Sequence, residues 1–375
     1  MKRIGILGAG QLGRMMALAG MPLGFEFALY DTSGAPSAGL GTIFSDPDNT
    51  QSELDRFLDF VDVVTYEFEH LPLDLAQNIA ARKPLYPGVE ALRVCQNREH
   101  EKALFTQLGI PTPKYRLANS PEELAEAARE LGTPVVAKSI TEGYDGKGQA
   151  VLKSAEEAEE AWNSIGHPRL IVESFVNFSR EISIIAARSS SGETVTYPLA
   201  ENIHHGGILR YTIAPAPRIS AELAQKAAEY IEKLMAHLSY VGVLALELFE
   251  TPDGLLANEM APRVHNSGHW SMNGAHTGQF ENHLRAVAGL PLGDTQPVGV
   301  SCMINLIGRH ADRESVLTLS DTHLHLYGKE ERAGRKLGHI NIVAEDYKAL
   351  IAKVEKCLPF VPEHTPFTSS LAHFD

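Results

Sequence analysis

The chain of 375 residues carries a formal net charge of −14, and 44% of its residues are hydrophobic. This composition is that of a globular protein with two or three cores, so disorder is not the expected state. The acidic balance argues against a general nucleic-acid-binding surface, which needs an excess of basic residues. Three dispersed cysteines, no apolar run of about 18 residues and no signal-peptide pattern predict a cytoplasmic protein with no membrane partner and no disulfide framework.

The first hundred residues alternate short apolar runs with helical patterns. In chain order, the predicted elements are a strand at 3–7, a helix from Gln11, a strand at 26–30, a helix near 50–59, a strand at 61–67 and a helix at 71–81. The β-branched residues at 61–65 suit a strand that is buried on both faces of a parallel sheet. We therefore expect an α/β domain with a doubly wound parallel sheet.

Three glycines lie between the first predicted strand and the first helix. Gly8, Gly10 and Gly13 form a G-x-G-x-x-G pattern, and Asp31 follows where a dinucleotide fold carries its ribose-binding acid. Taken alone, this pattern indicates a nicotinamide- or flavin-dependent oxidoreductase. A loop of this kind at a helix N-terminus can also hold a single phosphate group on its backbone amides.

A segment with two prolines, Pro84 and Pro87, is expected to be a crossing loop that leads into a helix at about 98–109. A domain boundary is therefore expected near its end. The predicted domains are an N-terminal α/β domain at 1–97, a small central lid domain at 98–175 and a larger C-terminal domain at 176–375.

Two predicted helices of the central domain begin with a capping box. Ser120 pairs with Glu123 in the first helix, and Ser154 pairs with Glu157 in the second. A strand that ends at Lys138 and a glycine-rich loop lie between the two helices. The pattern predicts a small α+β lid.

From Ile171 onward the pattern becomes antiparallel. In chain order, we predict a strand in LIVESFV, two strands joined at Ser191 and Gly192, a helix at 220–239, a hairpin with its turn at 252–254, and two strands around a basic turn at 323–345. We therefore expect a mixed, largely antiparallel C-terminal domain.

The hairpin at 243–259 carries the strongest functional signal. Glu247 lies in its first strand and Glu259 in its second. Hard cations such as Mg²⁺ take oxygen ligands, so two carboxylates on adjacent strands can hold one or two ions against a nucleotide triphosphate. The alternative is a pair of solvent-facing acids on an edge hairpin, which the apolar neighbours of Glu247 disfavour.

The loop at 141–149 is a candidate phosphate-binding loop. Gly143, Gly146 and Gly148 let backbone amides approach phosphate oxygens, while Lys138 and Lys147 add positive charge. The loop is not a Walker A sequence, and an ordinary surface loop is an equally good interpretation of it.

The segment IVESFVNFSREISII is a candidate hinge that reads an adenine edge with its backbone. Glu173 precedes the hinge, and Glu181 follows eight residues later, where it can accept hydrogen bonds from ribose hydroxyls. Without other signals, the segment is more simply a strand with ordinary acids.

Taken in this order, the α/β domain, the lysine strand with its glycine loop, the hinge and the glutamate hairpin resemble the ATP-grasp superfamily. Within it, the chain resembles the bacterial and fungal N5-carboxyaminoimidazole ribonucleotide synthetases of purine biosynthesis. The resemblance covers nearly the full chain and is carried by GAGQLGRM, TYEFEH, EGYDGKGQ, YPLAENIHHGGILR, NEMAPRVHNSGHW and YGKEERAGRKLGH. It implies an α/β (α+β overall) ATP-grasp fold with an N-terminal pre-ATP-grasp domain.

The resemblance also implies a reaction. ATP and bicarbonate carboxylate 5-aminoimidazole ribonucleotide through carboxyphosphate, and ADP and phosphate are released. Chemistry of this type depends on positioning and charge neutralisation. The implied ATP contacts are Arg98, Lys138, Lys147, Glu173, Phe175, Val176, Glu181 and His204, and the implied Mg²⁺ ligands are Glu247 and Glu259.

Arg263, His265 and Asn266 are implied to form the bicarbonate or carboxyphosphate pocket, because a guanidinium fork matches a pair of carboxylate-like oxygens. Tyr144 and Asp145 are the implied partners of the substrate amine. The implied contacts of the ribonucleotide are Gln11 and Leu12 at its phosphate, Glu67 at its ring or ribose, and Lys329, Arg335 and Lys336 from the basic turn. That turn is alternatively a solvated surface loop, and His204 alternatively lies on a loop surface. Members of the family are usually homodimers.

Three other classes of function remain open from the sequence. One is the dinucleotide-dependent oxidoreductase that the first glycines indicate, although it leaves the glutamate hairpin unexplained. Another is a different ATP-grasp ligase, such as a formate-dependent glycinamide ribonucleotide transformylase or a biotin carboxylase. The last is a non-catalytic binding module. If the glycines hold a substrate phosphate, Asp31 is only an acid at a strand end.

Overall fold

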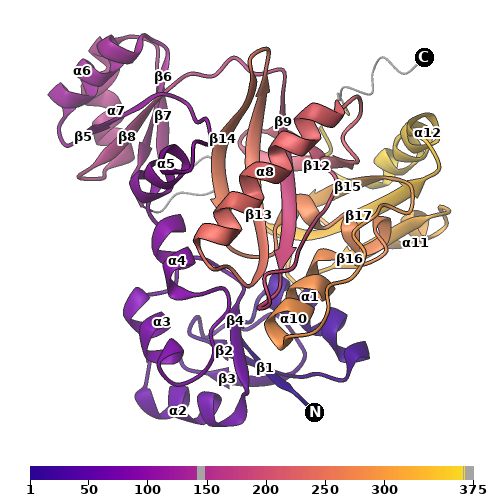
Figure 1. Cartoon of the computed structure of the whole chain (residues 1–375). Coiled ribbons are helices and arrows are strands. Elements are labelled where there is room, and N and C mark those ends of the chain that lie inside the picture. The colour runs from indigo at the N-terminus through magenta and orange to yellow at the C-terminus, as the bar shows by residue number, and fades with distance from the viewer. Residues whose placement is uncertain (142–147, 366, 368–375) are drawn as a thin grey trace.

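Three β-sheets follow one another along the chain in the computed structural model, which describes residues 1–141, 148–365 and 367. Figure 1 shows the N-terminal sheet at the bottom, the central sheet at the upper left and the largest sheet in the middle and on the right. Tyr144, Asp145 and Lys147, which the sequence places in the site, lie outside the described residues. Among the described helices, none has the length and apolar character needed to cross a membrane.

The N-terminal sheet is parallel, with the strand order β3-β2-β1-β4. Its strands are β1 (Arg3–Leu7), β2 (Glu26–Asp31), β3 (Thr42–Ser45) and β4 (Val63–Tyr66), and its helices are α1 (Gln11–Gly20), η1 (Met21–Leu23), α2 (Gln51–Phe60), α3 (Leu73–Ala80) and α4 (Val89–Cys95). All four residues of β4 are buried, as expected for a strand covered on both faces. The doubly wound layout is confirmed, but β3 and α4 were not predicted. β3 is short and buries only Phe44 fully, so its apolar pattern is weak.

The central sheet is antiparallel and has the strand order β5-β8-β6-β7. Its elements are α5 (Arg98–Gln107), β5 (Tyr115–Ala118), α6 (Pro121–Leu131), β6 (Val135–Ser139), β7 (Gln149–Leu152), η2 (Ala155–Glu157), α7 (Ala158–Ile165) and β8 (Leu170–Ser174).

The helix caps of this region only partly match the predicted capping boxes. The Ser120 hydroxyl accepts a hydrogen bond from the Glu123 amide at 3.2 Å, as predicted. The Glu123 carboxylate, however, accepts from the amide of Asn119, one residue earlier. At the second helix Ser154 makes no side-chain cap, because the chain there begins with a 3₁₀ turn and Glu157 accepts from the Lys153 amide.

The third sheet is antiparallel, and its main path is β14-β13-β9-β11-β12-β15-β17-β16, with β10 paired to β9. Its strands are β9 (Arg180–Arg188), β10 (Thr194–Thr196), β11 (Ala200–His205), β12 (Ile208–Ala214), β13 (Gly242–Thr251), β14 (Gly254–Ala261), β15 (Val300–Ile307), β16 (Thr322–Leu326) and β17 (Lys336–Ala344). Its helices are α8 (Ala221–His237), η3 (Asn266–Gly268), α9 (Ser271–Gly274), α10 (Gln279–Ala288), α11 (Arg313–Leu317), α12 (Tyr347–Cys357) and η4 (Leu358–Phe360). The β13–β14 hairpin and the two strands around the basic turn were predicted.

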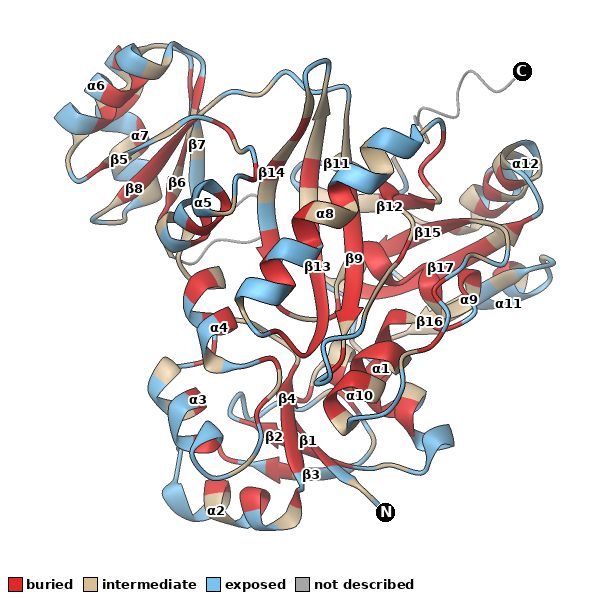
Figure 2. Cartoon of the chain, viewed as in Figure 1, coloured by how far each residue is buried: buried red, intermediate tan, exposed pale blue. Residues whose placement is uncertain are grey.

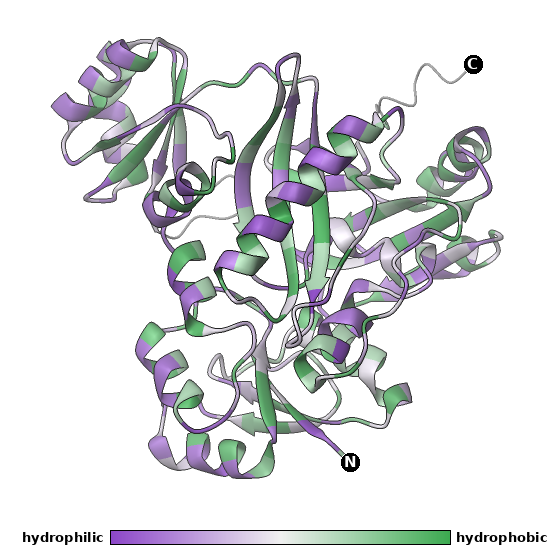
Figure 3. Cartoon of the chain, in the orientation of Figure 1, coloured by the Kyte–Doolittle hydropathy of each residue, from purple (hydrophilic) through white to green (hydrophobic). Residues whose placement is uncertain are grey.

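Helices cover the large sheet on both faces. α8 lies across β9, β13 and β14, where Ile231 and Leu234 share one core cluster with Leu244 and Leu246. Beneath it, most of β9 and the first half of β13 are buried in Figure 2, whereas β14 is only partly buried, and the outer side of α8 is hydrophilic in Figure 3. α10 packs against α1 of the N-terminal domain as well as against β9 and β13. It therefore fixes the loop after β1 relative to the hairpin.

His283 on α10 lies at the junction between the N-terminal and the largest sheet. The Val243 amide donates to its Nδ1 at 3.1 Å, so Nε2 carries the proton and donates to the Thr65 hydroxyl at 2.8 Å. The side chain is completely buried, and burial lowers the pKa of His283 to about 4. The native ring is therefore neutral at pH values where the unfolded ring is protonated.

We expect this ring to make the fold acid-sensitive. Because its folded pKa lies below its unfolded value, the unfolded chain binds an extra proton between about pH 6.5 and 4, and the free energy of unfolding falls as the pH is lowered through that window. The slope from one such group is at most about 1.4 kcal/mol per pH unit. The free energy of unfolding, measured with urea between pH 4.5 and 7, is expected to change less with pH in His283→Gln than in the wild type. The exposed control His237→Gln is expected to keep the wild-type slope; equal slopes for His283→Gln and the wild type would contradict the buried neutral ring.

Candidate active site

A cavity of about 680 Å³ is lined by residues from all three parts of the chain. Of the sequence-predicted site residues that the structure describes, all line it except Lys329 and Arg335. They are Gln11, Leu12, Glu67, Arg98, Lys138, Glu173, Phe175, Val176, Glu181, His204, Glu247, Glu259, Arg263, His265, Asn266 and Lys336. Residues from both ends of the chain thus converge on one cavity.

Glu247 and Glu259 are directly paired positions on β13 and β14, and a β-bulge follows Glu247. Burial, and then the neighbouring charge of Glu259, raise the pKa of Glu247 to about 7. Among the described residues, no group of three or more His, Cys, Asp or Glu is arranged to hold a metal ion. Mg²⁺ often takes only one or two carboxylates together with substrate phosphates, so this pair of acids fits such an ion.

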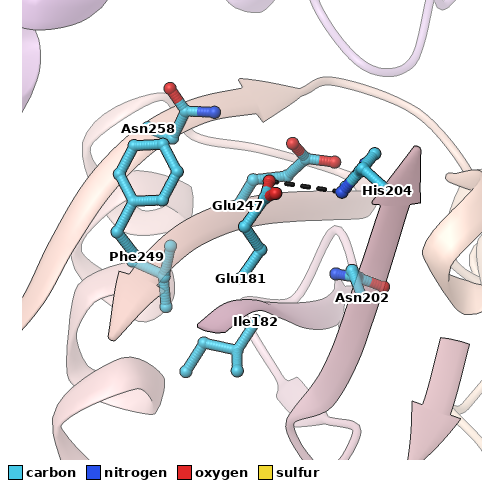
Figure 4. A pocket seen from close by; sticks show the side chains of 8 residues that line it. Glu181, Ile182, Asn202, His204, Glu247, Phe249 and Asn258 are labelled. Atoms are coloured by element: carbon cyan, nitrogen blue, oxygen red, sulfur yellow. Dashed lines mark ion pairs between the residues drawn. The ribbon is translucent and has the colours of Figure 1, made fainter. Parts of the chain in front are cut away.

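A second group of polar side chains faces the acids from β9 and β11. Figure 4 shows Glu181 and His204 pointing toward Glu247, and the His204 Nδ1 lies 3.2 Å from a Glu181 carboxylate oxygen. Burial alone would lower the pKa of His204, but the hydrogen bond and charge of Glu181 outweigh it, and the pKa is raised. The contact with Glu181 therefore favours the protonated form of His204 beside the acids.

Arg263 is held by a carboxylate that the sequence analysis did not select. Its Nε and Nη2 donate to the two oxygens of Glu69, the latter at 2.9 Å, in a bidentate pair. Burial alone would raise the pKa of Glu69, but Arg263 lowers it to about 2. The pair fixes the plane of the guanidinium group at the edge of the cavity.

His265 and Asn266 are each fixed by a further side chain. The Nδ1 of His265 lies 2.9 Å from the Ser267 hydroxyl, and burial followed by the charge of Arg263 lowers the pKa of His265 to about 3. His265 is therefore neutral in the site. Asn266 exchanges two hydrogen bonds with Asn305 on β15, at 3.1 and 2.8 Å.

Lys138 and Glu173 form an ion pair of 2.6 Å, and the same carboxylate lies 2.9 Å from Lys102 on α5. Burial alone would raise the pKa of Glu173, but Lys138 and Lys102 lower it to about 2. Both carboxylate oxygens of Glu173 are thus engaged by lysines. The Glu173 side chain therefore binds two lysines in this structure. The hinge residues Phe175 and Val176 line the cavity beside it.

The glycine loop before α1 already holds an anion, which is the carboxylate of Glu67. The amides of Gly10 and Gly13 donate to its two oxygens at 2.5 and 2.7 Å. Burial raises the pKa of Glu67, and these hydrogen bonds offset part of the effect. The N-terminus of α1 is therefore capped from within the protein.

The basic turn reaches the same loop from the far end of the chain. Lys329 donates to the side-chain oxygen of Gln11, although Lys329 does not itself line the cavity. Arg335 donates to the Glu330 carbonyl within its own turn at 3.3 Å, and Lys336 lines the cavity. Two of the three predicted basic residues thus lie next to the predicted substrate site.

Sequence reasoning missed the residues that hold the predicted ones. Glu69 stands two residues after Glu67 in TYEFEH, so the alternation of acids was a usable signal. Lys102 and Asn305 offered none, because Lys102 is one of five polar residues at the start of α5 and Asn305 is a single amide in an apolar strand.

The fold and the convergence of acids, lysines and hinge on one cavity define an ATP-grasp protein. The model of the ATP-grasp domain matches residues 103–280, that of the ribonucleotide synthetase preATP-grasp domain matches 1–96, and that of the phosphoribosylaminoimidazole carboxylase C-terminal domain matches 301–353. The fold class predicted from the sequence is confirmed.

Similar proteins specify the family. The N5-carboxyaminoimidazole ribonucleotide synthase of Pseudomonas aeruginosa is 46% identical over 94% of this chain and 97% of its own, and that of Escherichia coli is 40% identical over 96% of each. The crystal structure of the synthetase from Thermus thermophilus has 48% identity and a TM-score of 0.93 over 97% of this chain and 100% of that one. The Aspergillus clavatus enzyme, in complex with ADP and 5-aminoimidazole ribonucleotide, has 28% identity and a TM-score of 0.87 over 96% of this chain and 99% of that one. The chain belongs to the N5-carboxyaminoimidazole ribonucleotide synthase family, as its sequence motifs indicated.

The close contact between Gly8 and Glu67 predicts that even a small side chain at position 8 destabilises the protein. This residue has φ +105°, and an added Cβ would lie 2.5 Å from the Glu67 Cγ and Oε1. Gly8→Ala is therefore expected to lose about 1–2 kcal/mol from its backbone conformation and about 1–3 kcal/mol more from the clash. Gly24→Ala is the matched control, since Gly24 has φ +80° and an added Cβ there meets nothing within 4 Å. Urea unfolding measures both losses, and equal values would show that Glu67 yields without cost.

Proposed function

We propose that this protein is the ligase that uses ATP and bicarbonate to convert 5-aminoimidazole ribonucleotide into N5-carboxyaminoimidazole ribonucleotide in purine biosynthesis. The observation that carries the proposal is the cavity in which the Glu247–Glu259 pair faces Arg263, beside the hinge and Lys138. The names of the family members support the substrate, and the solved complexes with ATP, or with ADP and the ribonucleotide, support the two ligands.

The nucleotide is proposed to lie between the central sheet and the β13–β14 hairpin. Arg98 and Lys138 would neutralise its phosphates together with Lys147, and Phe175 and Val176 would contact the adenine. Glu181 would accept hydrogen bonds from the ribose, with His204 near the phosphates. Glu173 has both oxygens on lysines, so we assign its side chain to holding Lys138 and any adenine contact to its backbone.

Glu247 and Glu259 are proposed to hold Mg²⁺. Burial and then the charge of Glu259 raise the pKa of Glu247, and a divalent cation would favour the ionised form of both acids. The two carboxylates leave the other positions of the ion to phosphate oxygens and water. When bound, the ion would offset the charge that develops on the transferred phosphoryl group.

The chemistry has two steps that balance without a protein nucleophile. A bicarbonate oxygen attacks the γ-phosphorus, ADP leaves, and carboxyphosphate forms. The uncharged amine of the ribonucleotide then attacks the carboxyl carbon, phosphate leaves, and the amine loses one proton. Arg263, whose plane Glu69 fixes, would bind the bicarbonate oxygens, while neutral His265 and Asn266 supply hydrogen bonds.

The ribonucleotide is proposed to lie between the glycine loop and the basic turn. Gln11, Leu12, Lys329, Arg335 and Lys336 would surround its phosphate, and Tyr144 and Asp145 would hold the amine. Glu67 accepts from the amides of Gly10 and Gly13, and the Leu12 amide also acts on it, so a phosphate on the backbone of Gln11 and Leu12 would lie beside this acid, which braces the loop.

We also propose a cytoplasmic homodimer. The three described cysteines are free thiols, which suits a reducing compartment. The exposed apolar side chains of Leu18, Met21, Leu23 and Leu290 lie around α1, η1 and the end of α10, and they support a subunit interface there.

Light scattering tests the dimer. It is expected to give twice the chain mass for the wild type and the single mass for Leu18→Asp/Met21→Asp. A wild-type monomer would overturn this part.

The activity itself is tested by ADP release. With Mg²⁺, ATP and bicarbonate present, we expect 5-aminoimidazole ribonucleotide to raise the rate at least tenfold. Stimulation only by glycinamide ribonucleotide with formate, or only by biotin, would assign the chain to a different ATP-grasp ligase. Tight NADH binding with no ADP release would indicate the oxidoreductase instead.

Glu259→Gln tests the metal role. We expect turnover to fall at least a hundredfold, because a metal-binding charge is lost at the point where phosphoryl charge develops. Because Glu259 is an exposed residue of the cavity wall, the unfolding midpoint should change little. Glu250→Gln, on the same hairpin but paired with Arg180, is the control that should keep the activity. Unchanged Mg²⁺-dependent turnover in Glu259→Gln would refute the assignment.

A further inference from the structure

Lys102 is a fully buried lysine outside the catalytic machinery described above. Its side chain is 1% exposed, and it is not one of the described residues that line the cavity. A buried ammonium group is costly unless each of its donors has a partner. Its partners therefore show which parts of the protein it holds together.

Those partners belong to two different sheets. The Nζ of Lys102 donates to the Asn258 carbonyl at 2.7 Å and to the Thr112 hydroxyl at 2.9 Å, with the Ala257 carbonyl at 3.4 Å. The same Nζ lies 2.9 Å from Glu173 on β8 of the central sheet. One charge thus joins β14, which carries Glu259, to the strand before the hinge.

The residue before Lys102 holds β14 on the other side of Glu259. The Glu101 carboxylate accepts a hydrogen bond from the Met260 amide at 2.7 Å. Consecutive residues of α5 are therefore hydrogen-bonded to the backbone of β14 at Asn258 and at Met260, the two neighbours of Glu259. The position of the Glu259 backbone is defined by this helix.

On its other side, Lys102 competes with Lys138 for one carboxylate. Glu173 holds Lys138 at 2.6 Å through one oxygen and Lys102 through the other. Without Lys102, the whole charge of Glu173 would act on Lys138. Lys138 would then be less available to a phosphate group.

We propose that Lys102 is a positioning residue that couples the metal-binding strand β14 to the nucleotide-binding strands β6 and β8. It acts through Asn258 on Glu259 and through Glu173 on Lys138, and it touches neither nucleotide nor metal. The inference rests on the proposed function for the identity of the ligands. A residue with this role affects ATP and Mg²⁺ together and leaves the ribonucleotide site unchanged.

The test measures ATP, Mg²⁺ and ribonucleotide dependence in Lys102→Met, which removes the charge and keeps the length. We expect the KM for ATP and the half-saturating Mg²⁺ concentration each to rise at least fivefold, while the KM for 5-aminoimidazole ribonucleotide stays within twofold. Lys226→Met, an exposed lysine of α8, is the matched control and should leave all three values unchanged. If Lys102→Met shows wild-type values, the coupling role is wrong.

A second variant keeps the test decisive where Lys102→Met unfolds because Glu173 is left buried with one partner. Lys102→Met/Glu173→Gln removes both charges and should restore the urea midpoint. It is compared with Glu173→Gln alone. A purely structural lysine predicts identical kinetics for these two variants, whereas coupling through Asn258 predicts at least a threefold higher Mg²⁺ requirement in the double variant.

Failure of the coupling role can be distinguished from failure of the proposed function. Calorimetric binding of ADP with Mg²⁺ to the wild-type protein, and ribonucleotide-stimulated ADP release, test the function. If both are seen in the wild type and the Lys102 variants behave as their controls, only the coupling is refuted. If the wild type binds no nucleotide, the function itself is refuted.

Discussion

The repulsion between Glu247 and Glu259 is the constraint on which the rest of the site depends. The two acids are paired positions on neighbouring strands, and burial with the charge of the partner raises the pKa of Glu247 to about 7. Both acids are ionised together only beside cations; otherwise one of them takes up a proton. The fold places Arg263, Lys336 and His204, whose pKa is raised, around the same cavity, and a bound metal ion would complete the neutralisation.

Three cationic or dipolar groups of the site are each held by an internal carboxylate. Glu69 holds Arg263, Glu173 holds Lys138, and Glu67 holds the N-terminus of α1. In every case the group that would bind an anionic substrate is fixed before the substrate arrives, so little reorientation remains during the reaction. The arrangement also explains how a protein of net charge −14 could bind the three anionic ligands of the proposed reaction. The positive charges are local, and acids that line the same cavity keep them in place.

Most of the N-terminal α/β order, the hairpin and the strands around the basic turn could be predicted from the sequence because each has a local signature. β12, α10, β15 and α12 of the C-terminal part were not predicted. The period of apolar residues indicates the strands of the parallel sheet, and the Pro-Asp-Gly turn indicates the hairpin. The register from that turn pairs Leu248 with Ala257, and a β-bulge after Glu247 then places this acid opposite Glu259. The bulge has no local signature in the sequence. β3 and α4 could not be predicted, since β3 buries little and α4 lies in a proline-rich segment. The occupant of the glycine loop was also beyond reach: the pattern predicts an anion, but a phosphate and the carboxylate of Glu67 satisfy the same amides.

The residues that position the site were the hardest to predict, and the reason is physical. Lys102 and Glu101 bind mainly backbone groups of β14, at Asn258 and Met260. Every residue carries the same backbone groups, so such a contact leaves no pattern in the partner's sequence. Consecutive residues of a helix also point about 100° apart, which normally assigns them to different neighbours. Here one strand passes close enough to the helix to take both, because Thr112, in the segment that leads out of α5, is hydrogen-bonded to the same strand. Lys102 and Glu101 can therefore act together only because α5 lies beside β14, and this arrangement is visible only in the tertiary structure.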